Sequence, residues 1–73
     1  MTINNIDIIL KIITSRKLVC KKKGSRTRFS LSGLSFECSN RLADRILLFI
    51  KKGNFRNLRS LLDHHIENIE TNF

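Results

Sequence analysis

Two turn signals, Gly24-Ser25 and Ser32-Gly33, divide the middle of the chain into three short segments, residues 17–22, 26–31 and 34–38. Apolar and polar residues alternate in the last two segments, which is typical of strands that bury one face. The residues that would share the buried face are Leu18, Cys20, Phe29, Leu31, Leu34, Phe36 and Cys38. Residues 17–38 are therefore predicted to form a three-stranded antiparallel meander with one apolar and one basic face.

Helical spacing occurs on both sides of the meander, over residues 3–13, 40–52 and 55–70. Ser39 is a suitable N-cap, Gly53 stands where a C′ glycine belongs, and Asn54 can cap the last helix. Isoleucine is so frequent in residues 3–13 that a strand stays an alternative there. Only the helices can cover the apolar face of the sheet. The prediction for residues 1–73 is one small α+β domain of order α-β-β-β-α-α, with its helices packed on one face.

The first predicted helix carries more apolar surface than one neighbour can cover. Its apolar residues span about 220° of the helical wheel. A chain of 73 residues buries a limited core, and association is a common remedy. A homodimer is therefore expected, with the first or the third helix at the interface. In the second helix, a leucine at position 48 stands outside the apolar stripe, among cations. The interface candidates are Ile3, Ile6, Leu10, Leu48 and Phe55.

Positive charge is the feature of the composition that bears most on function. The chain has 14 Lys and Arg against 6 Asp and Glu, a formal net charge of +8. Eight cations fall between Lys11 and Arg28, and no acid occurs between Asp7 and Glu37. Cations crowded on one hairpin without a nearby carboxylate repel one another, and a polyanion would relieve that repulsion. The candidate nucleic-acid-binding residues are Lys17, Lys21, Lys22, Lys23, Arg26 and Arg28.

The chemistry of these candidates favours a duplex. Lys and Arg neutralise phosphates and release condensed counterions. Arg26 and Arg28 stand two apart on one strand, so both guanidinium forks should point the same way and contribute more than any single lysine. No aromatic residue interleaves with the basic face, which disfavours single strands that bind by base stacking. The leading hypothesis is a small nucleic-acid-binding regulatory protein that contacts the phosphate backbone of a duplex, DNA or RNA, through a basic β-hairpin.

Two other classes of partner also use positive potential. A protein–protein adaptor would present its basic face and its apolar helices to an acidic protein, and composition does not separate it from a nucleic-acid binder. A membrane surface could bind the apolar first helix together with the lysines that follow it. The membrane hypothesis is disfavoured because the same helix is needed to cover the sheet.

Enzyme, metal and cofactor functions are not indicated by the sequence. The carboxylates are scattered, and no glycine-rich phosphate loop is present. The adjacent His64 and His65 would point about 100° apart on a helix, so they cannot chelate one metal together. Cys20 and Cys38 belong to no C-x-x-C pair and are expected to be reduced, structural thiols. The sequence predicts a cytoplasmic protein with no signal peptide, no cofactor and no small-molecule substrate.

Overall fold

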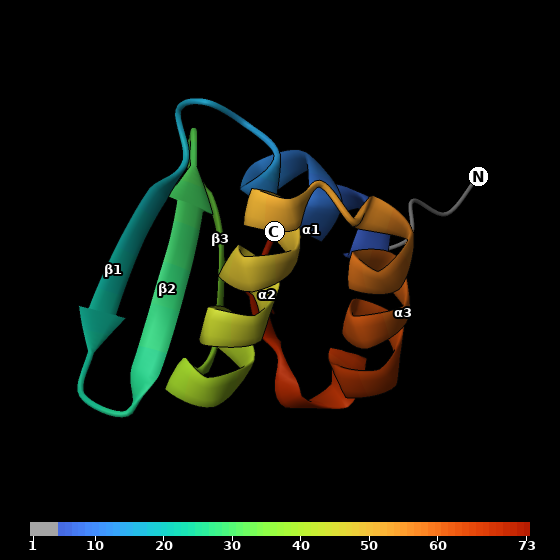
Figure 1. Ribbon diagram of the computed structural model, residues 1–73. Coiled ribbons are helices and arrows are strands. Elements are labelled where there is room, and N and C mark those ends of the chain that lie inside the picture. The colour runs from blue at the N-terminus through green and yellow to red at the C-terminus, as the bar shows by residue number, and fades with distance from the viewer. Residues whose placement is uncertain (1–4) are drawn as a thin grey trace.

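The structure, a computed structural model, describes residues 5–73 and contains one antiparallel sheet with three helices on one side of it (Figure 1). The predicted α+β class is confirmed. The predicted first helix is a helix from Asn5 onward, and Ile3 lies outside the described residues. The elements in chain order are α1 (Asn5–Ile13), β1 (Val19–Lys23), β2 (Arg26–Leu31), β3 (Leu34–Ser39), α2 (Asn40–Lys52), α3 (Phe55–His65), the 3₁₀ turn η1 (Ile66–Asn68) and β4 (Glu70–Asn72).

The sheet has the strand order β1-β2-β3-β4, and every neighbouring pair is antiparallel. Arg28 on β2 stands opposite Lys21 on β1 and opposite Glu37 on β3. Glu37 in turn stands opposite Glu70 on β4. Directly opposed residues of an antiparallel pair point to the same face of a sheet. These four charged residues therefore share one face, called here the outer face, and the helices lie on the other, the inner face.

The core lies between the inner face of the sheet and the helices. α1 and α2 pack against β2 and β3, and α3 packs against α1 and α2 (Figure 1). Phe29 and Phe36 are opposite each other on β2 and β3, and their rings stack with centroids 4.9 Å apart. Alternation explains this pair, because each ring sits between polar residues that point outward. The buried apolar residues are Ile6, Ile9, Ile12, Ile13, Phe29, Phe36, Cys38, Leu42, Ala43, Ile46, Leu58, Leu61, Leu62 and Ile69.

The C-terminal segment differs from its prediction. The helix expected over residues 55–70 ends at His65. After a 3₁₀ turn the chain forms β4, which pairs with β3 on the side away from β2. The meander is therefore part of a four-stranded sheet rather than a three-stranded one. The extra strand pairs backbone groups of β3 that would otherwise stay without partners. Ile69, 7% exposed, anchors this segment in the core, and residues 70–72, which were expected to continue or follow a helix, pair with β3 instead.

Gly53 ends α2 in the left-handed conformation that the sequence predicts, with φ of 69°. Its N–H donates to the Ile50 carbonyl oxygen at 3.0 Å. No atom lies within 4 Å of the place that a Cβ would take at Gly53. A side chain there would therefore lower stability through the left-handed backbone conformation and not through a steric clash. Gly53→Val is therefore expected to lower the free energy of unfolding by about 1 kcal/mol or more. Thermal denaturation measures this, and an unchanged melting curve would contradict it.

Candidate nucleic-acid interface

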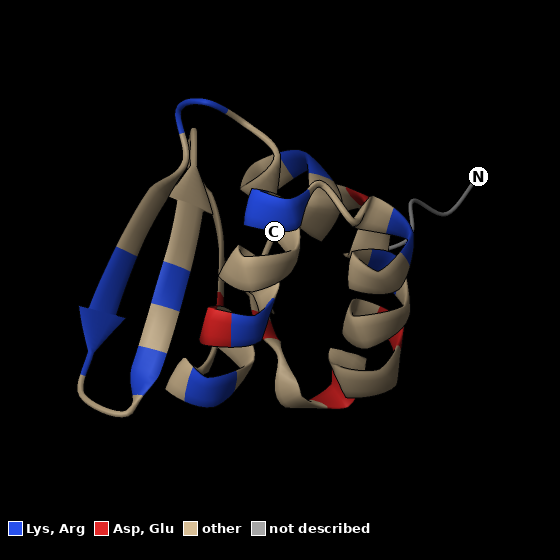
Figure 2. Ribbon diagram, viewed as in Figure 1, with Lys and Arg blue, Asp and Glu red and all other residues tan. Residues whose placement is uncertain are grey.

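The β1–β2 hairpin presents its outer face without any helix over it. Lys21 stands opposite Arg28, and Lys23 stands opposite Arg26, so all four cations point to the outer face. Figure 2 shows Lys and Arg along both strands and in the loop that leads into β1, with no Asp or Glu on either strand. The structure thus brings together four of the six residues that the sequence singles out for nucleic-acid binding.

The other two candidates lie elsewhere. Lys22 points to the inner face, opposite Thr27, and its Nζ lies 4.0 Å from Asp44 Oδ1 on α2. Lys17 precedes β1, in a loop where its backbone N–H donates to Ser15 Oγ at 3.1 Å, and its side chain is exposed. The first strand therefore begins at Val19, two residues later than predicted. Lys17 is thus an exposed cation just before the hairpin, whereas Lys22 is directed toward α2.

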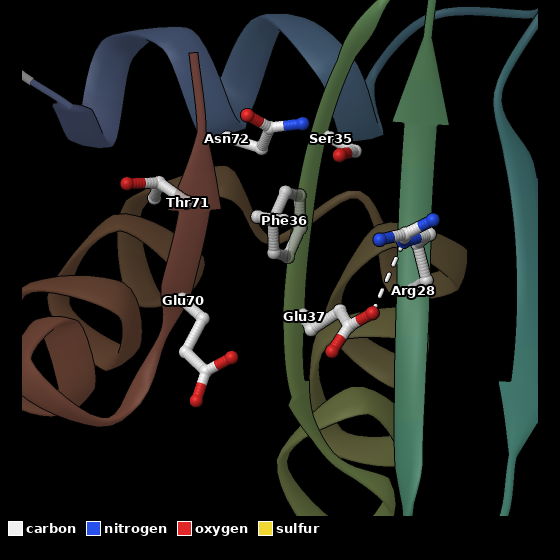
Figure 3. A pocket seen from close by; sticks show the side chains of 7 residues that line it. All are labelled: Arg28, Ser35, Phe36, Glu37, Glu70, Thr71 and Asn72. Atoms are coloured by element: carbon white, nitrogen blue, oxygen red, sulfur yellow. Dashed lines mark ion pairs between the residues drawn. The ribbon is translucent and has the colours of Figure 1, made fainter.

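Acidic residues on β3 and β4 lie beside the two arginines, so the expectation that no carboxylate is near them is wrong. Arg28 Nε lies 3.0 Å from Glu37 Oε1 (Figure 3). Arg26 Nε lies 3.8 Å from Glu37 Oε2, and Arg26 Nη2 lies 3.7 Å from Glu70 Oε1. These acids are distant in sequence and come close only through strand pairing. The positive charge that stays uncompensated on the outer face is therefore that of Lys21 and Lys23.

Two hollows on the outer face differ in charge. One, of about 130 Å³ between β3 and β4, is lined by Arg28, Glu37 and Glu70 together with uncharged residues, and its excess of acids does not suit an anion (Figure 3). The other, of about 410 Å³, lies at the hairpin turn. It is lined by Lys23, Arg26 and Arg28 with Glu37 as the one acid. The hollow at the turn therefore has an excess of cations, with Lys23 as the one that makes no ion pair among residues 5–73.

A hydrogen-bond network fixes the hairpin turn to the start of α2. Thr27 Oγ1 donates to Asn40 Oδ1 at 2.7 Å, and Asn40 Nδ2 donates to the Gly24 carbonyl oxygen at 3.0 Å. The Asn40 N–H also donates to the Ser25 carbonyl oxygen at 3.1 Å. Asn40 is the first residue of α2, whose N-cap Ser39 accepts from the Leu42 N–H as predicted. The cations at the turn are therefore carried by a backbone that is tied to the core.

A second group of cations, on α2, was not included among the sequence-based candidates. Its members are exposed, and within residues 5–73 none of them makes an ion pair. The helical spacing already places three of them on one face around Leu48, so the pattern was visible in the sequence. These cations are less dense along the sequence than those of residues 11–28. These cations are Arg41, Arg45, Lys51 and Lys52.

The residues proposed for a dimer interface are divided by the structure. Ile6 is 4% exposed and belongs to the chain's own core, and Leu10 packs partly against that core. Leu48 and Phe55 are 49% and 48% exposed. Contacts with the sheet and with α3 bury four isoleucines of α1, while Ile8 and Leu10 stay partly buried, and the homodimer stays a prediction. Among the described candidates, Leu48 and Phe55 are the most exposed, and Leu10 is partly buried.

Both cysteines are free thiols, as predicted, but their surroundings differ. Cys38 is buried, whereas Cys20 is exposed, contrary to its expected place on the buried face. Cys20 does point to the inner face, opposite Phe29, but β1 lies at the edge that the helices do not cover. Strands are about 4.8 Å apart, so β1 and β3 are separated by more than the ~7 Å that a disulfide spans. Burial raises the pKa of the Cys38 thiol to about 11, and burial also raises the pKa of Cys20.

Iodoacetamide is expected to modify Cys20 in the folded protein and Cys38 only after unfolding, because the reagent needs an accessible thiolate. The raised pKa of Cys38 also makes stability pH-dependent. An unfolded thiol ionises near pH 8.5, so this contribution is complete below that pH and is lost as pH rises toward 11. Mass spectrometry after labelling with and without urea measures which of the two thiols iodoacetamide reaches in the folded protein. Equal labelling rates for both thiols in buffer would contradict the prediction.

Two absences apply to residues 5–73. No helix there has the length and apolar character needed to cross a membrane. No group of three His, Cys, Asp or Glu side chains in the same range is placed to hold a metal ion. The rings of His64 and His65 contact each other edge to face, with centroids 4.9 Å apart.

Comparisons with protein-family models, with curated proteins and with solved structures found no match to this chain. The function is therefore inferred from the charge and geometry of the chain's own surface.

Proposed function

We propose that the protein is a small nucleic-acid-binding regulatory protein of the cytoplasm that contacts the phosphate backbone of a duplex through the β1–β2 hairpin. The observation that carries the proposal is the pair Lys21 and Lys23. Both are exposed on a face without helices, and no acid lies within ion-pair distance of either among residues 5–73. Lys17 adds a third exposed cation at the start of the hairpin.

The hairpin can act as a positively charged ridge along a phosphate backbone. β1 is an edge strand, so its lysines are accessible from the side as well as from the outer face. Arg28 contributes through the part of its guanidinium group that Glu37 does not occupy, since an arginine has five N–H donors. The phenylalanine rings of the sheet, Phe29 and Phe36, are packed in the core and offer no stacking platform for bases. A duplex therefore suits this surface better than a single strand.

The test is a fluorescence-anisotropy titration of the full chain with duplex DNA, duplex RNA and a single strand at several salt concentrations. Three or four phosphate contacts per chain predict a slope of log affinity against log salt of about −3 to −4 on B-form DNA. A single strand should bind more weakly than either duplex. If none of the three binds more tightly than about 100 µM at ~50 mM salt, below even ordinary non-specific affinity, the proposal fails.

Removing the carboxylate that holds the arginines should strengthen binding. Glu37→Gln frees Arg28 and loosens Arg26, whose closest carboxylate oxygens belong to Glu37 and Glu70. The expected result is a gain of several-fold in duplex affinity and a salt slope steeper by about one. Asp63→Asn is the matched control, because it makes the same change in net charge on an exposed position of α3. Equal gains in the two variants would mean that only net charge matters.

A further inference from the structure

A groove of about 410 Å³ runs between α2 and α3, and no strand residue lines it. Phe49, half-buried, and Leu61, 8% exposed, supply its apolar surface. Arg45 stands on the α2 side, and the α3 side is formed by polar residues that carry no acid. The lining residues are Arg45, Phe49, Asn57, Ser60, Leu61 and His64. The groove thus combines an apolar floor with one cationic wall.

The exposed face of α2 beside the groove carries a row of uncompensated cations, of which Arg45 lines the groove itself. Arg41, Arg45 and Lys52 follow each other at intervals of four and seven residues, which places them on one face of the helix. Leu48, 49% exposed, stands among them. The single acid of α2, Asp44, lies 4.0 Å from Lys22 Nζ, and within residues 5–73 the three cations have no acidic partner. Such a row lacks counter-charges that a ligand could supply.

We infer that this groove binds an amphipathic helix of another protein, with apolar side chains along one face and a row of Asp or Glu beside them. A helix laid into a groove between two helices buries its apolar row against the floor. Its carboxylates then meet Arg45 in the groove and Arg41 one turn earlier on α2. Each guanidinium group can donate two parallel hydrogen bonds to a carboxylate. Because no Lys or Arg of α3 lines the groove, the acidic row belongs on the α2 side, which fixes the orientation of the bound helix about its axis.

Charge complementarity favours this partner over two other possible occupants of the groove, a second copy of the chain and a nucleic acid. A second copy of the chain does not fit, because no helix within residues 5–73 joins an exposed apolar row to an acidic one. α1 buries four of its isoleucines, leaves Ile8 partly buried and carries Asp7 as its one acid. α2 and α3 each carry a single acid. A nucleic acid would use the cations but would leave Leu48 and the apolar floor without a partner. The inference goes beyond nucleic-acid binding by the hairpin and does not depend on it.

The experiment uses the full chain and a labelled synthetic peptide long enough to lie along the 13-residue α2. The peptide carries leucine at every third or fourth position with glutamates flanking one side, and a scrambled peptide of the same composition is the control. Fluorescence anisotropy should show binding tighter than about 100 µM, circular dichroism should show that the peptide gains helix, and the scrambled peptide should not bind. Equal binding of the two peptides would overturn the inference.

Charge reversal then tests the wall. Arg45→Glu is expected to weaken peptide binding about tenfold, because it sets like charges against each other. Arg56→Glu makes the same change in charge on an exposed residue that does not line the groove, and it should leave the affinity unchanged. A peptide with lysine in place of glutamate should bind the Arg45→Glu variant more tightly than it binds the parent protein. This gain is possible only if the groove of the variant is folded. The inference is wrong if the lysine peptide does not bind Arg45→Glu better than it binds the parent protein. It is also wrong if duplex DNA displaces the glutamate peptide from the parent protein and if Arg45→Glu weakens DNA binding as much as it weakens peptide binding.

Discussion

Replacing Phe36 with alanine is expected to lower the free energy of unfolding by about 3–5 kcal/mol, the usual range for a buried phenylalanine. Phe36 is 1% exposed, and its ring stacks on that of Phe29 between the sheet and the helices. A domain of this length has a total stability of roughly 4–11 kcal/mol, at 0.05–0.15 kcal/mol per residue. The substitution should therefore remove much of the folded population, and urea denaturation followed by circular dichroism will measure it.

Phe55→Ala is the control for this experiment, because it deletes the same atoms from a ring that is 48% exposed. It should change the free energy of unfolding by less than about 1 kcal/mol, since little apolar surface returns to water. If both variants shifted the denaturation midpoint equally, Phe36 would not be at the centre of the core. The comparison also tests whether Phe55 is packed against a second chain, in which case its replacement would lower stability more at high protein concentration.

The strands and helix ends that local chemistry determines were predictable from the sequence. Apolar and polar residues alternate along β2 and β3 because one face of each strand is buried against helices. Six residues are enough to recognise this two-residue period in the sequence. Ser39 and Gly53 mark the two ends of α2 by capping chemistry that needs no tertiary information. In these places the local preference and the tertiary structure agree, so the prediction required only neighbouring residues.

Features that depend on contacts between distant residues were not predictable. β4 has three residues, too few to show alternation, and the apolar spacing of Ile66 and Ile69 continues that of α3. Cys20 points inward, as its position in the pattern implies, but exposure depends on whether a helix reaches β1, and the helices pack on β2 and β3. The apolar arc of α1 suggested a second chain, and the sequence alone did not show how much of that arc the sheet and α3 bury. Sequence patterns give the direction of a side chain more reliably than what lies over it.

The same limit applies to the candidate interface. The run of lysines was visible in the sequence, and the structure leaves Lys21 and Lys23 exposed on an uncovered face. The neutralisation of Arg26 and Arg28 was not visible, because Glu37 and Glu70 reach them only through strand register. Under the proposed function, Glu37 and Glu70 would compete with phosphate for the arginines, whereas no acid among residues 5–73 pairs with Lys21 or Lys23. We therefore expect these two lysines to contribute more than their hydrogen-bonding chemistry alone suggests.

Changing Lys17, Lys21 and Lys23 together to alanine is expected to reduce duplex affinity by about two orders of magnitude at ~0.1 M salt and to flatten the salt slope by about three. Each ammonium group neutralises one phosphate, so the loss should be similar for all sequences. All three side chains are exposed, and none makes an ion pair within residues 5–73, so the fold should tolerate the change. Anisotropy titrations at three or more salt concentrations give both quantities.

Two controls show whether position or net charge is responsible. Lys22→Ala removes a cation from the same strand, but on the inner face beside Asp44, and it should change the slope by much less than one third of the triple effect. Replacing Lys51, Lys52 and Arg56 with alanine removes three exposed cations from the corner between α2 and α3 and should leave the slope nearly unchanged. If this second triple variant lost as much affinity as the first, binding would depend on the total charge of the chain and the hairpin would have no special role. A loss confined to Lys17, Lys21 and Lys23 would place the phosphate contacts on the uncovered edge of the sheet, where the acids of β3 and β4 do not reach.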